Sequence, residues 1–418
     1  MVLDVLVIGI CIAALVNSNL TIVAKHGLPY KYANKLNLLL AYHLFFSVVF
    51  TVYILNLGGD SYGYWKYLMQ QVPVHFESMG EFFGTSTTFI LWMNFYPSKV
   101  LGLEYITGNI LYGFLGFIGM RYLFVMVAEL FPTNYKVLQI PLFPTIFFFP
   151  NFHFWTAGVG KDTICFWGIA WFMYAVQNYR LRWWQGLFAL FFVYMARPHM
   201  GLSILMAATL AILLGTEIKA AYKVGLLILA VSGSLYLSVG ALEFLEIEDF
   251  SIDTLDALAT KKSAYLSVAK SSVDTSGYNL LMKIFTYMYR PLFIDAHNII
   301  AFLSGFENIL YLYLTFFIVR NWTPEALRDM PVFIKAGIIA FVPITIAFAS
   351  SLSNLGIIMR MKNMTMIYFV LFVFFLIAYN KKLRIQKLQE KIKYYQQREE
   401  IKAKKVAVGK SENSRVRE

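Results

Sequence analysis

Apolar stretches long enough to cross a lipid bilayer recur along almost the whole chain of 418 residues. A membrane-spanning helix needs about 20 apolar residues, and hydrocarbon leaves its backbone no hydrogen-bond partner outside the helix. Only 14% of the residues are charged, against about 25% in an ordinary soluble domain. The sequence therefore excludes a soluble globular fold and predicts an all-α, polytopic transmembrane bundle.

We expect about eleven spans, at residues 2–23, 36–56, 105–128, 138–157, 163–178, 183–196, 200–215, 222–241, 297–319, 332–349 and 363–380. A further apolar segment, residues 85–96, is a candidate re-entrant or interfacial helix. The first span lacks a basic start and a small-residue cleavage site, so we expect it to stay in the protein as a helix.

Lysine and arginine favour the cytoplasmic side of a membrane. The short connections at residues 24–35, 130–137, 179–182, 216–221 and 320–331 are basic, whereas the long ones at 57–104 and 242–296 are more acidic than basic. This pattern predicts an outer N-terminus and a cytoplasmic C-terminus. It also divides the chain into a membrane domain, residues 1–380, with outer loops 57–104 and 242–296, and a basic cytoplasmic tail, residues 381–418.

The tail holds 13 Lys/Arg and 5 Asp/Glu, which accounts for most of the net charge of +12. Because the basicity is concentrated there, nucleic acid is not an expected partner. Leu388, Ile392 and Tyr395 recur at helical spacing, which indicates an interfacial or short coiled helix on anionic membrane lipids, or a docking site for assembly proteins. The two cysteines form no disulfide framework, and no cluster has metal-ligand spacing, so we expect no metal or other cofactor.

Several polar clusters fall on the predicted outer face. Asp60 follows the second span in GGDSYGYWKYL, residues 58–68, and could act as a general base beside aromatic rings on which a sugar stacks. A turn with an interfacial aromatic belt is the alternative. Lys161 precedes Asp162 in a Gly-rich turn that lacks P-loop spacing; it could bind an anion at a helix N-terminus or only reach the lipid headgroups.

Three arginines on that face are the candidate binding groups. Arg197 lies with His199 in a hinge too short to leave the membrane surface, and its planar guanidinium suits a pyrophosphate; His199 is a candidate proton carrier or a structural residue. Arg360, with Lys362, lies in an expected outer loop, residues 353–364. Together with Arg290 and Lys161 these arginines predict an electropositive cleft for a polyprenyl pyrophosphate.

Arg290 begins another cluster, which also contains Asp295 as a candidate catalytic acid and His297 as a candidate binding residue. Glu307, also a candidate substrate-binding residue, is expected deep in the following span, where an ionisable side chain usually has a partner, and Arg290 or Arg360 could be that partner.

These motifs together, GDSYGYW (59–65), FPNFHFWTAGVGKDTICFW (149–167), ARPHMGL (196–202), YRPLFIDAHNIIAFLSGFENILY (289–311) and SNLGIIMRMK (353–362), resemble O-antigen and exopolysaccharide polymerases and the wider GT-C glycosyltransferases. The resemblance implies an enzyme of the bacterial inner membrane that transfers or polymerises extracytoplasmic sugars from a polyprenyl-diphosphate-linked glycan. It implies that Arg197, Arg290 and Arg360 bind the diphosphate and that Asp60 is the acidic residue, although the acid usually follows the first span in GT-C enzymes.

A flippase or transporter for the same lipid-linked glycan is the alternative, since it would need the same cationic cleft. Against it, the chain shows no repeated halves and no corresponding pair of broken helices.

Overall fold

The computed structural model describes residues 1–71, 76–130, 135–214, 223–225, 228, 232–233, 271–275, 277–296 and 298–415. The chain in these ranges is almost entirely helical, which confirms the all-α prediction. Six of the described helices are long and apolar enough to cross a membrane: α1 (Val2–Lys25), α2 (Lys31–Leu57), α6 (Tyr105–Leu130), α15 (Ile299–Asn321), α17 (Val332–Ser351) and α18 (Leu355–Arg415). They correspond to six of the eleven predicted spans.

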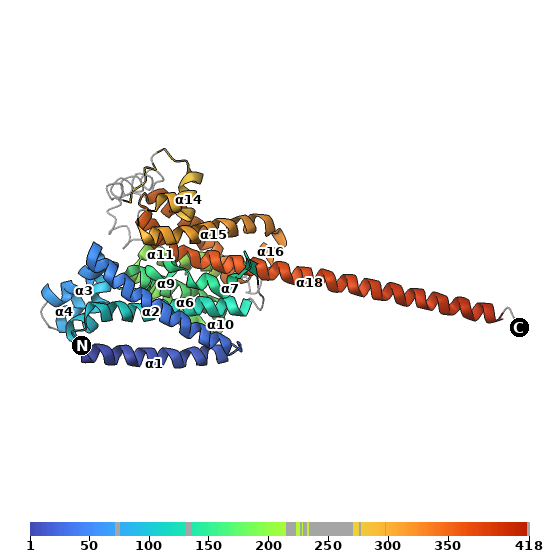
Figure 1. The fold of residues 1–418 in the computed structure, drawn as a ribbon, viewed down its shortest axis with the longest axis horizontal. Helices are drawn as coiled ribbons and strands as arrows, with labels where there is room; N and C mark the ends of the chain where they lie inside the picture. Colours follow the sequence, from blue (N-terminus) through green and yellow to red (C-terminus); the bar gives the residue numbers. More distant parts are fainter. Residues whose placement is uncertain are drawn as a thin grey trace.

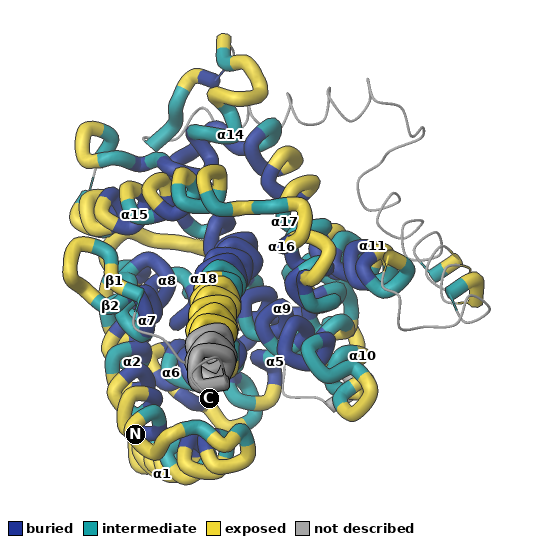
Figure 2. The backbone as a smooth tube through the Cα atoms, turned by 90° about the vertical axis from the view of Figure 1, so that its right-hand side faces the viewer, coloured by how far each residue is buried: buried dark blue, intermediate teal, exposed yellow. Residues whose placement is uncertain are grey.

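Helix α18 is the axis of the bundle. Its membrane portion packs against α17, α9 (Lys161–Gln177), α15, α6 and α8 (Pro150–Phe154), and the view along it shows these helices arranged around it (Figure 2). Beyond Asn380 the same helix continues out of the bundle as the tail, and it is largely exposed as far as Lys402 (Figure 1). The predicted tail is thus a direct extension of the most central span.

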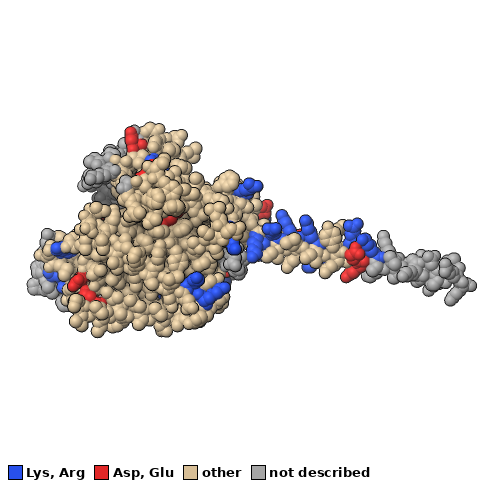
Figure 3. All heavy atoms as spheres, in the orientation of Figure 1, with Lys and Arg blue, Asp and Glu red and all other residues tan. Residues whose placement is uncertain are grey.

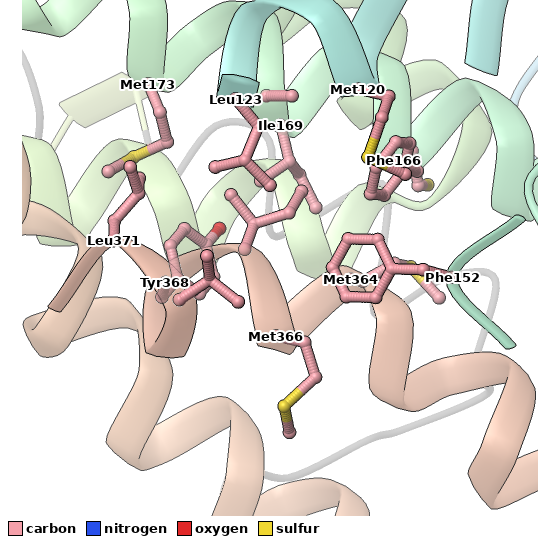
Figure 4. Packing of buried hydrophobic residues seen from close by; sticks show 14 of the residues in the cluster. Met120, Leu123, Phe152, Phe166, Ile169, Met173, Met364, Met366, Tyr368 and Leu371 are labelled. Carbon is pink, nitrogen blue, oxygen red and sulfur yellow. The ribbon is translucent and has the colours of Figure 1, made fainter. Parts of the chain in front are cut away.

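The apolar core is densest where α6, α9 and α18 meet. Met120 and Leu123 of α6, Phe166 and Ile169 of α9, and Tyr368 of α18 point into one cluster, which Phe152 of α8 also joins (Figure 4). Gly119 brings α6 close to α9: a Cβ there would lie 2.8 Å from the Trp167 Cα atom. Small residues serve this purpose in membrane bundles, where close packing of backbones stabilises helix pairs.

The predicted span at residues 138–157 is not one helix. It consists of a hairpin of β1 (Lys136–Val137) and β2 (Ile140–Pro141), then α7 (Leu142–Thr145), η2 (Ile146–Phe148) and α8. Prolines at 141, 144 and 150 explain the breaks, because proline lacks the N–H that a continuing helix needs. Phe147, Phe152 and Phe154 are buried in the bundle, where irregular backbone is shielded from lipid.

The next three predicted spans are helical but short: α9, α10 (Tyr179–Ala196) and α11 (Pro198–Leu213). The predicted span 222–241 and most of the loop 242–296 lie outside the described residues. The described end of that loop forms α14 (Leu280–Tyr289) and a short turn, η3 (Phe293–Asp295); α16 (Pro324–Arg328) links α15 to α17.

The first predicted outer loop is mostly helical. It contains α3 (Asp60–Gln71), α4 (Phe76–Glu81), α5 (Thr87–Asn94) and the π-helix η1 (Phe95–Val100), so the segment 85–96 is helical as expected. Trp65 anchors α3: its ring is buried and its Nε1 donates to the Leu103 carbonyl at 3.1 Å.

The expectation that residues 353–364 form an outer loop is wrong. Asn354 caps α18 by accepting from the Ile357 N–H, and Arg360 and Lys362 lie within the helix that follows. Lys362 is completely buried. Arg360 and Lys362 can lie within this helix because each has hydrogen-bond partners inside the protein. The hydropathy of the sequence does not register such partners.

Candidate functional site

Two adjoining hollows lie at the end of the bundle where α2 ends and α18 begins. The first, here called the inner pocket, has a volume of about 200 Å³ and is lined by Asp60, Tyr64, Gly158, Asp162 and Arg360, among others. The second, the aromatic groove, has a volume of about 600 Å³ and is lined mainly by α3, including Tyr62, Tyr64 and Tyr67. Asp60 and Tyr64 line both hollows, so they form the boundary between them.

Local sequence explains how Arg197 and Arg360 are placed near the inner pocket. Arg197 precedes Pro198, and a residue before proline is held out of the helical region, so α10 ends at Ala196 and α11 begins at Pro198. Arg197 therefore sits in an extended link between two helices. Arg360 lies in the second turn of α18 and lines the pocket.

Asp162 joins these two arginines. Arg197 donates from Nη2 to Asp162 Oδ1 at 2.6 Å, and Arg360 donates from Nε to Asp162 Oδ2. The Asp162 side chain is 8% exposed and belongs to the first turn of α9, where a helix dipole also favours a carboxylate. The sequence interpretation named Asp162 only as the neighbour of Lys161. Its position beside Lys161 did not reveal that it bridges Arg197, which is 35 positions away in the chain, and Arg360, which is 198 positions away.

Arg360 retains donors for a ligand. Its side chain is 27% exposed and lines the inner pocket, and within the described part of the chain only its Nε is hydrogen-bonded. Arg197 is more enclosed, at 14% exposure, and its Nε is buried without a partner among the described residues. The carboxylate of Asp162 thus holds both guanidinium groups in place while Arg360 keeps both Nη groups available.

Lys161 is at the same end of the bundle but is engaged. Its Nζ donates to Ser86 Oγ at 2.9 Å and to Thr87 Oγ1 at 3.0 Å, which ties the start of α5 to the start of α9. Gly158 closes the floor nearby: a Cβ there would lie 2.1 Å from the Phe50 ring. Lys161 and the inner pocket therefore lie against tightly packed residues.

Asp60 is exposed at the mouth of the inner pocket, and its charge interacts with Arg360 and Lys161. Burial, together with the nearby charge of Asp60, raises the pKa of Tyr64, and a hydrogen bond to Thr87 partly offsets this. Tyr64 therefore stays a neutral phenol that can donate a hydrogen bond. The charged residues that line the pocket are Asp60, Asp162 and Arg360. Arg197 and Lys161 lie beside this group without lining the pocket, and with them three cations and two carboxylates leave one excess positive charge.

Arg290 and Asp295 form a separate pair. Arg290 donates from Nη2 to Asp295 Oδ1 at 2.6 Å and from Nε to Oδ2 at 3.0 Å, and the Leu292 N–H also donates to Asp295 at 2.9 Å. The hydrogen bonds from Arg290 hold the pKa of the Asp295 carboxyl below its usual value, against the opposing effect of burial. Neither residue lines the inner pocket, and Arg197 adjoins it only through Asp162, so the expectation that all three arginines share one hollow is wrong: of the three, Arg360 lines it.

Glu307 is buried as expected, but the prediction of its partner is wrong, since neither Arg290 nor Arg360 pairs with it. Glu307 Oε1 accepts from the Asn151 N–H at 2.6 Å, and Oε2 has no partner among the described residues. Lys362 lies close by, donating to Asn308 Oδ1 at 2.7 Å and to the Arg290 carbonyl at 3.0 Å. These contacts tie α8, α15 and α18 together inside the bundle.

Of the two candidate histidines, the structure describes only His199, which does not line the inner pocket. The His199 side chain is exposed at the start of α11 and its ring lies against Phe348, with centroids 6.3 Å apart. His297 lies outside the described residues. Within the described ranges no group of His, Cys, Asp and Glu side chains is arranged to hold a metal ion.

Comparisons with protein-family models, with characterised proteins and with solved structures find no match for this chain. The site is therefore interpreted from its own geometry.

Proposed function

We propose that the protein transfers or polymerises sugars from a polyprenyl-diphosphate-linked donor, in the bacterial cytoplasmic membrane and on the side opposite its basic tail. One observation carries the proposal: a single exposed carboxylate, Asp60, stands at the boundary between a small pocket that contains Arg360 and a larger aromatic groove. A glycosyl transfer needs this division, because the diphosphate leaves the sugar carbon on one side while the incoming hydroxyl approaches it from another.

The inner pocket suits the diphosphate. Its volume of about 200 Å³ is too small for a lipid chain, which would remain in the bilayer, but it presents the free Nη groups of Arg360. When the bond between the sugar carbon and the diphosphate oxygen breaks, negative charge grows on that oxygen. A guanidinium already fixed by Asp162 stabilises this charge without having to move.

The aromatic groove suits a sugar acceptor. Tyr62, Tyr64 and Tyr67 supply ring faces, and Lys66 and Gln70 supply donors at its wall. Asp60 would take the proton of the acceptor hydroxyl while the oxygen of that hydroxyl forms the new bond to the sugar carbon. The proton then passes to water, and polyprenyl diphosphate is released.

The decisive experiment reconstitutes the purified protein with a polyprenyl-diphosphate-linked oligosaccharide and follows glycan length by mass spectrometry. Asp60→Asn keeps the shape of an exposed side chain and removes the base, so turnover should fall about 10²- to 10⁴-fold. Glu104→Gln is the matched control, since Glu104 is an exposed carboxylate at the same end of the bundle that does not line either hollow. Transport of the lipid across vesicles without bond formation would instead support a flippase.

A further inference from the structure

A third hollow lies at the opposite end of the bundle, where α18 leaves it. It has a volume of about 480 Å³ and is formed by Thr323 and Asn380 together with Arg384, Lys387, Leu388 and Lys391. Asn380 fixes the junction, because its Nδ2 donates to the Asn321 carbonyl at the end of α15, 3.1 Å away. The hollow is therefore bounded by two helices held in contact, and we call it the tail pocket.

The tail pocket is cationic. Arg384, Lys387 and Lys391 recur at intervals of three and four residues, so they lie on one face of α18. No carboxylate lines it, and within the described part of the chain none of the three makes an ion pair. The nearby Asp329 is already occupied by Arg328 and by the Tyr379 hydroxyl. The three cations of the tail pocket therefore favour an anionic ligand.

The position of the tail pocket indicates which anion. Burial of α18 ends at Ile377 and most residues from Lys381 to Lys402 are exposed, so the pocket lies at the surface of the membrane bundle. Lys and Arg side chains gather on the tail and at the adjoining end of the bundle (Figure 3). Basic residues at this level are attracted to the anionic lipids of the cytoplasmic leaflet, each by about 1 kcal/mol.

Helix α15 provides a surface for the rest of a lipid. Leu312, Phe316 and Val319 are exposed apolar residues at helical spacing, and this stripe leads toward Thr323 at the pocket. A soluble phosphate would use the cations alone, whereas a phospholipid would use both the cations and the stripe. We propose that the tail pocket binds the glycerophosphate headgroup of an anionic phospholipid, with an acyl chain along α15.

The test titrates the purified full-length protein with phosphatidylglycerol and, separately, phosphatidylcholine, and measures the first bound lipid by native mass spectrometry. We expect phosphatidylglycerol to bind at least tenfold more tightly. The variant Arg384→Gln/Lys387→Gln/Lys391→Gln should weaken the binding of phosphatidylglycerol about a hundredfold, because it removes three cations that each contribute about 1 kcal/mol. Binding of phosphatidylcholine should not change.

A matched variant, Lys382→Gln/Lys393→Gln/Arg398→Gln, removes the same charge from the same helix outside the pocket and should change affinity less than about threefold. Equal weakening by both variants would overturn the proposal, because it would show general attraction to the tail. Inorganic phosphate binding as tightly as the lipid would also overturn it, because the apolar stripe would then contribute nothing. The tail pocket is remote from Asp60, so these outcomes are independent of sugar transfer.

Discussion

The two arginine clusters of this protein differ in how many arginines share one carboxylate. Arg290 has Asp295 to itself, in a two-point ion pair that also closes a short turn. Arg197 and Arg360 share Asp162, so one positive charge is left over beside a hollow. A balanced pair stabilises the fold, whereas an unbalanced cluster is prepared to receive an anion. The ratio of arginines to carboxylates therefore separates the binding arginine from the structural one.

The largest effect expected is on the shared carboxylate. Asp162→Asn leaves two enclosed guanidinium groups without their counter-charge, which typically costs about 3–5 kcal/mol of unfolding free energy. Thermal unfolding in detergent should show a large fall in the melting temperature. Asp60→Asn, an exposed carboxylate at the same pocket, should change stability by less than about 0.5 kcal/mol. Similar melting of both variants would remove the distinction between the shared carboxylate and the exposed one.

The second effect concerns ligand binding. Arg360→Lys keeps the positive charge but loses the planar fork that binds a phosphate through two hydrogen bonds, so the KM for a diphosphate-linked donor should rise about tenfold. Arg290→Lys is the matched change in the balanced cluster and should leave KM unchanged. If Arg290→Lys raised KM as much as Arg360→Lys, the assignment of roles to the two clusters would be wrong.

The third effect is the acid sensitivity of the balanced cluster. Arg290 holds the pKa of Asp295 below its usual value, so the folded protein binds fewer protons here than the unfolded chain. This contribution to stability, about 1 kcal/mol for a partly exposed pair, is present above the unfolded pKa near 4 and is lost as the pH falls through the lowered pKa. Unfolding measured between pH 6 and pH 3 should be less pH-dependent in Asp295→Asn than in the wild type.

The smallest effect is on Tyr64. Burial and Asp60 raise the pKa of its phenol, so its ultraviolet titration, isolated as the difference from Tyr64→Phe, should have a midpoint above 10. Asp60→Asn should lower that midpoint. An unchanged midpoint would show that Asp60 does not act on Tyr64 across the boundary of the two hollows.

The sequence was sufficient for the long helices because apolar periodicity is a local property. It was insufficient at residues 138–157, where apolar content suggested a span but three prolines divide the backbone into short buried pieces. It also placed Lys362 outside, since a lysine raises local polarity. The structure shows instead that Asn308 and the Arg290 carbonyl receive its ammonium group inside the bundle.

The candidate site was predicted in part for the same reason. Asp60, Lys161, Arg197 and Arg360 were each noticed as polar groups near predicted helix ends, and the structure brings them to one end of the bundle. Whether a given arginine is already neutralised depends on a carboxylate far away in the chain. Asp162 and Arg360 are separated by 198 positions, and no local pattern in the sequence connects them.

Helix α18 runs without interruption from Leu355 to Arg415, so the arginine of one hollow and the cations of another belong to a single rod. At about 1.5 Å per residue, Arg360 and Lys387 lie roughly 40 Å apart along it. A tilt or rotation of the rod at one face of the membrane must appear at the other, unless the helix bends between them. The protein thus carries a mechanical connection between its two aqueous surfaces, made from one piece of backbone.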